Sequence, residues 1–218
     1  MTATAMHPTA LEGPALTAAI ADDRRQMADL LAALAPESWD AQSLCAGWRV
    51  REVVAHITMP FRLSTPQFIA EMLKAAGNFD RMADRRAKRD TAVMSSDQLL
   101  AALRDNATYQ WKPPGGGLLG ALTHDVIHGL DFAVPLNIDW DLPEDRIRSV
   151  LRAVTASRSM KHFGVDLQGI QLKADDIDWS YGSGIPVIGR AQDLILVICG
   201  RKLPTGRLQG EVSERFTR

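Results

Sequence analysis

The chain has 218 residues, a hydrophobic fraction of 46%, a charged fraction of 23% and a formal net charge of −1. These values are typical of a globular protein with one well-packed domain, or one domain with a small appendage. The balanced charge gives no electrostatic reason to expect a nucleic-acid partner. The longest apolar block, residues 194–199, is far shorter than the roughly 18 residues that cross a bilayer, so we expect no membrane insertion.

Two cysteines, Cys45 and Cys199, lie far apart in the sequence. Such sparse cysteines are typical of free thiols in a reducing compartment rather than of a disulfide framework. The first ten residues lack the basic start and apolar core of a signal peptide, and we expect residues 1–13 to form a disordered tail. These features predict a cytoplasmic protein.

Apolar residues recur at helical spacing over most of residues 14–163, which predicts a helical bundle with at least four long helices. In the first helix, Asp22, Asp23, Arg24 and Arg25 are expected on the solvent side. In the second, Pro60 is expected to stop or kink the helix. The expected helices cover residues 14–35, 48–58, 65–90, 95–109, 118–134 and 141–160.

The pattern changes after Gly164, where apolar and polar residues alternate as they do in strands. Short strands are expected at residues 170–174, 178–184 and 185–188, followed by a last helix over 190–199. The predicted fold is therefore mainly α: a helical-bundle domain over residues 14–163 and a small C-terminal α/β extension over residues 164–218.

Residues 122–131 contain His124 and His128, which lie four positions apart in an otherwise apolar segment. On a helix both imidazoles would point the same way, and a divalent metal can use such a pair. The third candidate ligand is His56, among apolar residues of the second expected helix. Hydrogen-bonded core histidines are the alternative, but three buried imidazoles are costly to leave unpaired, and one shared metal would satisfy three nitrogens.

The spacing of His124 and His128 also resembles a zinc-protease motif in which Asp125 replaces the usual Glu. That interpretation would need a third ligand from Glu144 or His162, beyond a helix-ending proline, so we favour the site with His56.

Several neighbours of the histidines have two open interpretations. Glu52, Asp125 and Asp131 are either carboxylates that fix the imidazole tautomers or plain surface charges. Cys45, expected at a helix start, is either a reactive thiolate or, more commonly for such a residue, a buried structural thiol. His7 and His162 have no companions in the sequence and are expected at the surface.

Three segments resemble the mycothiol-dependent maleylpyruvate isomerase family, within the wider DinB-like metalloenzyme superfamily. They are residues 45–56 (CAGWRVREVVAH), the histidine-containing helix through residue 131, and residues 178–184 (DWSYGSG). The resemblance covers most of the chain from the first helix to about residue 210. It implies a DinB-like four-helix bundle with a divalent metal, zinc or nickel, near one end.

The resemblance carries over to individual residues. His56 matches the family's ligand on the second helix and His128 its later histidine, whereas His124 stands where the isomerase has Glu. A neutral imidazole in place of an anion leaves the metal with more positive charge, which makes it a stronger Lewis acid. The isomerase's larger C-terminal domain is expected to be shortened here.

The resemblance further implies a low-molecular-weight thiol of the mycothiol type as cosubstrate. The predicted function is a metal-dependent thiol transferase or isomerase that acts on a small electrophilic substrate through a metal-bound thiolate. A non-catalytic metal- or ligand-binding bundle and a hydrolase that uses bound hydroxide are the alternatives. A homodimer is compatible with such a bundle.

Overall fold

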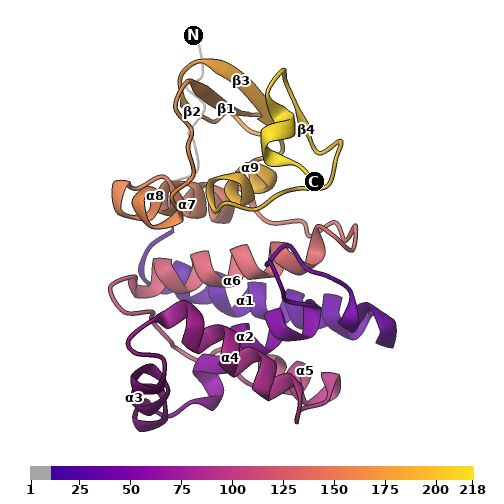
Figure 1. Cartoon of the computed structure of the whole chain (residues 1–218), viewed down its shortest axis with the longest axis vertical. Coiled ribbons are helices and arrows are strands. Elements are labelled where there is room, and N and C mark those ends of the chain that lie inside the picture. Colours follow the sequence, from indigo (N-terminus) through magenta and orange to yellow (C-terminus); the bar gives the residue numbers. More distant parts are fainter. Residues whose placement is uncertain (1–10) are drawn as a thin grey trace. The chain divides into compact units, whose positions relative to one another are not determined.

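The computed structural model describes residues 11–218. Residues 1–10, which make up most of the predicted tail, lie outside the described residues. The described chain is mainly helical, with a small sheet near its C-terminal end (Figure 1), which confirms the predicted fold class. The α-helices, in chain order, are α1 (Gly13–Ala32), α2 (Val50–Arg62), α3 (Thr65–Lys74), α4 (Phe79–Thr91), α5 (Ser96–Asp105), α6 (Gly117–Ala133), α7 (Glu144–Val154), α8 (Ser157–Phe163) and α9 (Ala191–Ile198).

The described chain divides into two compact units. Residues 17–138 form a helical unit, and residues 11–16 with 139–218 form a second unit that contains the sheet. The predicted boundary after residue 163 differs from this division because α7 packs against α8 and α9, and α9 packs against the sheet. Within residues 11–218, no helix is long and apolar enough to cross a membrane.

The core of the helical unit is built around α2, which packs against α4, α5 and α6. Its predicted apolar stripe, Val50, Val53, Val54 and Ile57, is at most 1% exposed. The helix continues past Pro60 to Arg62, so the expected stop at this proline is wrong. In the last turn a proline removes few helical hydrogen bonds, which makes it tolerable there.

The helix expected over residues 65–90 is in fact two helices, α3 and α4. Between them Ala76 and Gly77 both have positive φ, of 54° and 77°. Asn78 then caps α4 by accepting a hydrogen bond from the Arg81 backbone N–H. The apolar and charged residues keep helical spacing across this break, and only the Gly77-Asn78 pair signals it.

The first helix also differs from expectation on its polar face. Asp22 and Arg25 form an exposed ion pair, as expected, with 3.0 Å between Oδ1 and Nη1. Asp23 and Arg24, however, are completely buried. Their predicted place on the solvent side is wrong, and the partner that holds Arg24 lies on α6.

The carboxylate of Glu71 on α3 links α3 to α4. It is 8% exposed and pairs with Lys74 of α3 and with Arg85 and Arg89 of α4. Burial raises the pKa of Glu71, but hydrogen bonds and charge from Lys74 and Arg89 outweigh it and lower the pKa to about 2.

We expect this cluster to make the stability depend on pH. A carboxylate with a depressed folded-state pKa stabilises fully above its unfolded value near 4.5, and the gain is lost as the pH falls towards 2. Glu71→Gln should lower the free energy of unfolding at pH 7 by about 1 to 2 kcal/mol, since half-exposed cations are screened by water. The difference from wild type should shrink below pH 4.5 in urea titrations. Glu37→Gln, at an exposed position, is the control.

The sheet has the strand order β2-β1-β3-β4. The strands are β1 (Ile170–Ala174), β2 (Ser180–Gly182), β3 (Ile185–Gly189) and β4 (Leu208–Gln209). β1 is antiparallel to β2 and parallel to β3, and β4 adds to β3. The first three lie where alternation predicts strands. β4 was not predicted because two residues are too few to show a period.

Gly184 allows the tight passage from β2 to β3. Its φ is +128°, and an added Cβ would lie 2.1 Å from the carbonyl oxygen of Gly169, which accepts a hydrogen bond from the Ile185 N–H. Gly184→Ala should therefore destabilise the protein by about 3 kcal/mol or more, through backbone strain and steric overlap. Thermal unfolding would measure this loss. Ser183→Ala, at the neighbouring exposed position, should stay within about 0.5 kcal/mol of wild type.

Candidate metal centre

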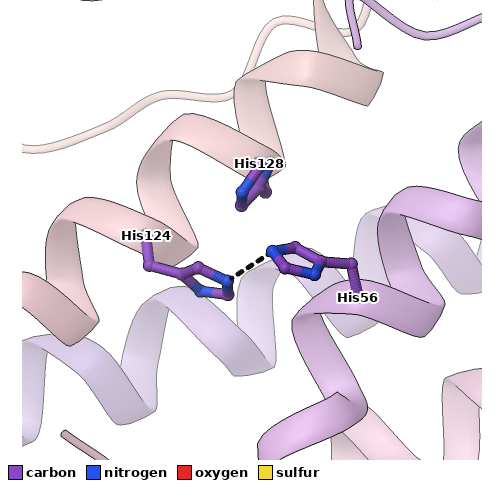
Figure 2. Close-up of side chains that lie close together, drawn as sticks. All are labelled: His56, His124 and His128. Carbon is purple, nitrogen blue, oxygen red and sulfur yellow. Dashed lines mark hydrogen bonds between the residues drawn. The ribbon is translucent and has the colours of Figure 1, made fainter. Parts of the chain in front are cut away.

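The three predicted ligands lie together within the helical unit. His56 comes from α2, and His124 and His128 come from α6, one turn apart. One ring nitrogen of each lies within 4.8 Å of those of the others, and the ring centroids are 4.7 to 5.0 Å apart. Figure 2 shows the three imidazoles facing a common point. Nε2 of His56 lies 3.1 Å from Nε2 of His124.

Two buried carboxylates hold the imidazoles on α6. Oδ1 of Asp125 lies 2.9 Å from Nδ1 of His124, and Oδ2 of Asp131 lies 2.9 Å from Nδ1 of His128. Both carboxylates are at most 1% exposed. In a neutral imidazole with its proton on Nδ1, Nε2 carries the lone pair, so the carboxylates leave Nε2 of both histidines as the coordinating atom.

Asp125 is in turn held by Arg24 of α1. The guanidinium Nε donates to Oδ2 of Asp125 at 2.7 Å, and Arg24 Nη1 donates to the carbonyl of Tyr109 at 2.7 Å. An arginine and an aspartate buried together in an apolar bundle compensate each other's charge. Arg24 was not predicted as a site residue, because its contact partners are 85 and 101 residues away in the sequence.

The thiol of Cys45 forms a hydrogen bond with the second carboxylate, that of Asp131. Its Sγ donates to Oδ2 of Asp131 at 2.9 Å and lies 3.9 Å from Nδ1 of His128. It precedes α2 by five residues, so the expected place at a helix start is wrong. Cys45, His128 and Asp131 form a second group of possible metal ligands on the Nδ1 side of His128.

The carboxylate of Glu52 contacts a residue at the start of α2 and a residue of α4. It accepts hydrogen bonds from the Arg49 backbone and side chain and from the Thr91 hydroxyl. Burial raises the pKa of Glu52, but these hydrogen bonds lower it by more than burial raises it. The pKa of Glu52 is therefore below its usual value. Glu52 thus caps α2 and links it to α4. His162 is exposed, as predicted, and His7 lies outside the described residues.

Aromatic rings surround the histidines. Trp48 packs against His56 and His128, Phe79 meets His56 edge-on, and Trp111 meets His124 edge-on at a centroid distance of 5.1 Å. No role for these rings was predicted from the sequence. Trp48 lies within the quoted segment at residues 45–56, while Phe79 and Trp111 carry no recognisable local signal.

The donor set fits a divalent metal ion. Imidazole nitrogens bound to zinc at about 2.0 to 2.1 Å in a tetrahedron lie about 3.3 Å apart, close to the distance between Nε2 of His56 and Nε2 of His124. Three neutral nitrogens suit zinc or nickel and leave room for a further ligand. That the three histidines bind a metal stays a prediction.

The sequence from residue 20 to residue 110 matches the family model described as the mycothiol maleylpyruvate isomerase N-terminal domain. This match confirms the predicted family resemblance. The matched span contains Cys45, Trp48 and His56 and ends before His124 and His128. A comparison with curated proteins gave no match.

Two solved structures are similar in fold. One is a mycothiol-dependent maleylpyruvate isomerase, with a TM-score of 0.51 and 13% sequence identity, covering 91% of this chain and 92% of that chain. The other is a variant of such an isomerase with one histidine replaced by alanine, with a TM-score of 0.52 at the same identity and coverage. At this identity the likeness establishes a shared fold.

The share of the isomerase chain that this chain matches corrects the expectation about the C-terminal part. Because 92% of the isomerase chain is matched, the expected shortening of the C-terminal part is wrong. The short strands and helix α9, interpreted from the sequence as a reduced tail, belong to a chain whose fold matches 92% of the isomerase chain.

The two carboxylates predict the tautomers of the metal-free protein. At a pH where the imidazoles are neutral, His124 and His128 should both carry the proton on Nδ1, as imidazole ¹⁵N chemical shifts can show. Asp131→Asn should change the tautomer mixture of His128, because an amide is a weaker acceptor than a carboxylate. His124 should keep its wild-type shifts, and a change at both histidines would contradict separate control by the two carboxylates.

Proposed function

We propose that His56, His124 and His128 bind one divalent metal ion, zinc or nickel. We further propose that the protein is a metal-dependent thiol transferase or isomerase. The cosubstrate would be a low-molecular-weight thiol of the mycothiol type, and the substrate a small electrophile. The observation that carries this proposal is the convergence of three imidazole nitrogens, two of them aligned by buried carboxylates. The family match over residues 20–110 supports the thiol chemistry.

When bound, a divalent ion at this position would lower the pKa of a thiol ligand so that the thiolate predominates at neutral pH. The chain's own residues prepare the site for it. Asp125 and Asp131 fix the donor nitrogens of His124 and His128, and an all-imidazole donor set adds no negative charge to the ion. The rings of Trp48, Phe79 and Trp111 provide apolar walls, which strengthen electrostatic interactions by excluding water.

Metal content tests the site. Protein purified without chelators should contain about one zinc or nickel ion per chain, and Ala substitution of His56, His124 or His128 should each reduce this strongly, because two imidazoles hold an ion poorly. Elemental analysis gives the ratio, and His162→Ala, at an exposed position on α8, should keep the wild-type content. Full metal content in all three site variants would refute the proposal.

Thiol consumption tests the reaction. With metal-loaded protein, a low-molecular-weight thiol should disappear in the presence of a panel of electrophiles such as α,β-unsaturated acids and epoxides, or the unsaturated acids should isomerise only when thiol is present. His128→Ala should abolish either activity. Turnover without thiol would favour the hydrolase, and full metal occupancy without any turnover would favour the non-catalytic binding protein.

The cytoplasm is the compartment that we propose, since it maintains a pool of reduced low-molecular-weight thiols. Cys45 and Cys199 form no disulfide in the structure, as a reducing environment favours.

A further inference from the structure

The guanidinium of Arg24 is the most deeply buried cation near the three histidines. Its side chain is 1% exposed, in a helix whose sequence predicted that it would face solvent. Burying a charge is costly unless the charge is paired and hydrogen-bonded. Nε and Nη1 of Arg24 meet this requirement through Asp125 and through backbone carbonyls of the segment after α5, whereas Nη2 is buried without a hydrogen-bond partner among the described residues.

The carboxylate of Asp125 uses its two oxygens for different partners. Oδ2 accepts from Arg24 Nε at 2.7 Å, and Oδ1 lies 2.9 Å from Nδ1 of His124. The hydrogen bond from Arg24 therefore fixes the rotation of the Asp125 carboxylate about χ2, and the fixed Oδ1 selects the His124 tautomer whose Nε2 carries the lone pair.

Arg24 also fixes the segment on the other side of the same imidazole. Its Nη1 donates to the carbonyl oxygen of Tyr109 at 2.7 Å, two residues before Trp111. Trp111 packs edge-on against His124, at a centroid distance of 5.1 Å. One guanidinium thus holds both the carboxylate that orients His124 and the chain segment whose indole packs against it.

The arrangement at His128 is different and provides an internal comparison. There, Asp131 accepts a hydrogen bond from the thiol of Cys45, a weak and neutral donor. At His124, in contrast, the orienting carboxylate of Asp125 pairs with the guanidinium of Arg24.

From these contacts we propose that Arg24 is a positioning residue for His124. Through Asp125 it sets the tautomer and orientation of His124, and it thereby raises the affinity of the three-histidine site for a divalent metal. The affinity part rests on the proposed metal function, whereas the tautomer part holds in the metal-free protein.

The test uses the full chain with Arg24→Met, which keeps the length of the side chain and removes its charge and donors. In metal-free protein, the imidazole ¹⁵N shifts of His124 should move towards a mixture of tautomers, while those of His128 stay at wild-type values. In competition with a chromophoric chelator, the Kd for zinc should rise about 10- to 100-fold, the range found when groups that orient metal ligands are removed.

A matched control separates positioning from general loosening of the bundle. Leu103→Ala, at a fully buried position on α5 in the same helical unit, should destabilise the protein by about 2 to 5 kcal/mol. It should leave the His124 shifts unchanged and the Kd for zinc within about threefold of wild type. If Arg24→Met fails to fold, Arg24→Lys replaces it, with changes in the same direction because an ammonium cannot reproduce the fork of guanidinium donors.

A double-mutant cycle identifies the route. If Arg24 acts through Asp125, the effect of Arg24→Met on the Kd for zinc should largely vanish in an Asp125→Asn background. The inference is overturned if the Arg24 variant keeps both the wild-type tautomer and the wild-type Kd, or if Leu103→Ala changes them equally. Absence of zinc binding by wild-type protein would instead overturn the proposed function, and the ¹⁵N shifts would still test the positioning of His124.

Discussion

A carboxylate buried in an apolar helical bundle must find a cation or several hydrogen-bond donors, and this requirement shapes the helical unit. Asp125 is fully buried on α6 and pairs with the fully buried Arg24 of α1. The pair joins the first helix to the helix that carries His124 and His128. Since removing one partner of such a pair leaves an uncompensated charge, the two residues restrict how α1 and α6 can pack.

The same carboxylate gives the histidines a defined chemistry. With its proton held on Nδ1 by Asp125, neutral His124 presents an acceptor at Nε2, so the 3.1 Å approach of Nε2 of His56 requires His56 to donate. A divalent cation between them would replace this single proton. The hydrogen bond therefore already brings Nε2 of His56 and Nε2 of His124 to nearly the spacing of two nitrogens bound to one zinc ion.

Parts of this organisation could be predicted from sequence because they are local. The stripe of Val50, Val53, Val54 and Ile57 follows from helical periodicity, and the pairing of His124 with His128 follows from their spacing of four. His56 was predicted as the third ligand from its apolar neighbours in the sequence and from the family motif. The division between α3 and α4 was missed because the apolar spacing continues across residues 76–78, where backbone conformation alone breaks the helix.

What could not be predicted depends on contacts between distant residues. Arg24 lies among charged residues on α1, and its burial follows from Asp125, 101 positions later in the chain. The contact of Trp111 with His124 likewise depends on how the segment before α6 folds back. Periodicity describes one helix at a time and carries no information on which polar residue of one helix meets which of another.

The histidines and both carboxylates that orient them belong to residues 17–138, so the donor set is complete within one of the two compact units. Residues 139–218 contribute no member of this set. Sequence divergence in the sheet unit can consequently proceed without dismantling the donors. The proposed metal centre therefore places no constraint on the residues of the sheet unit.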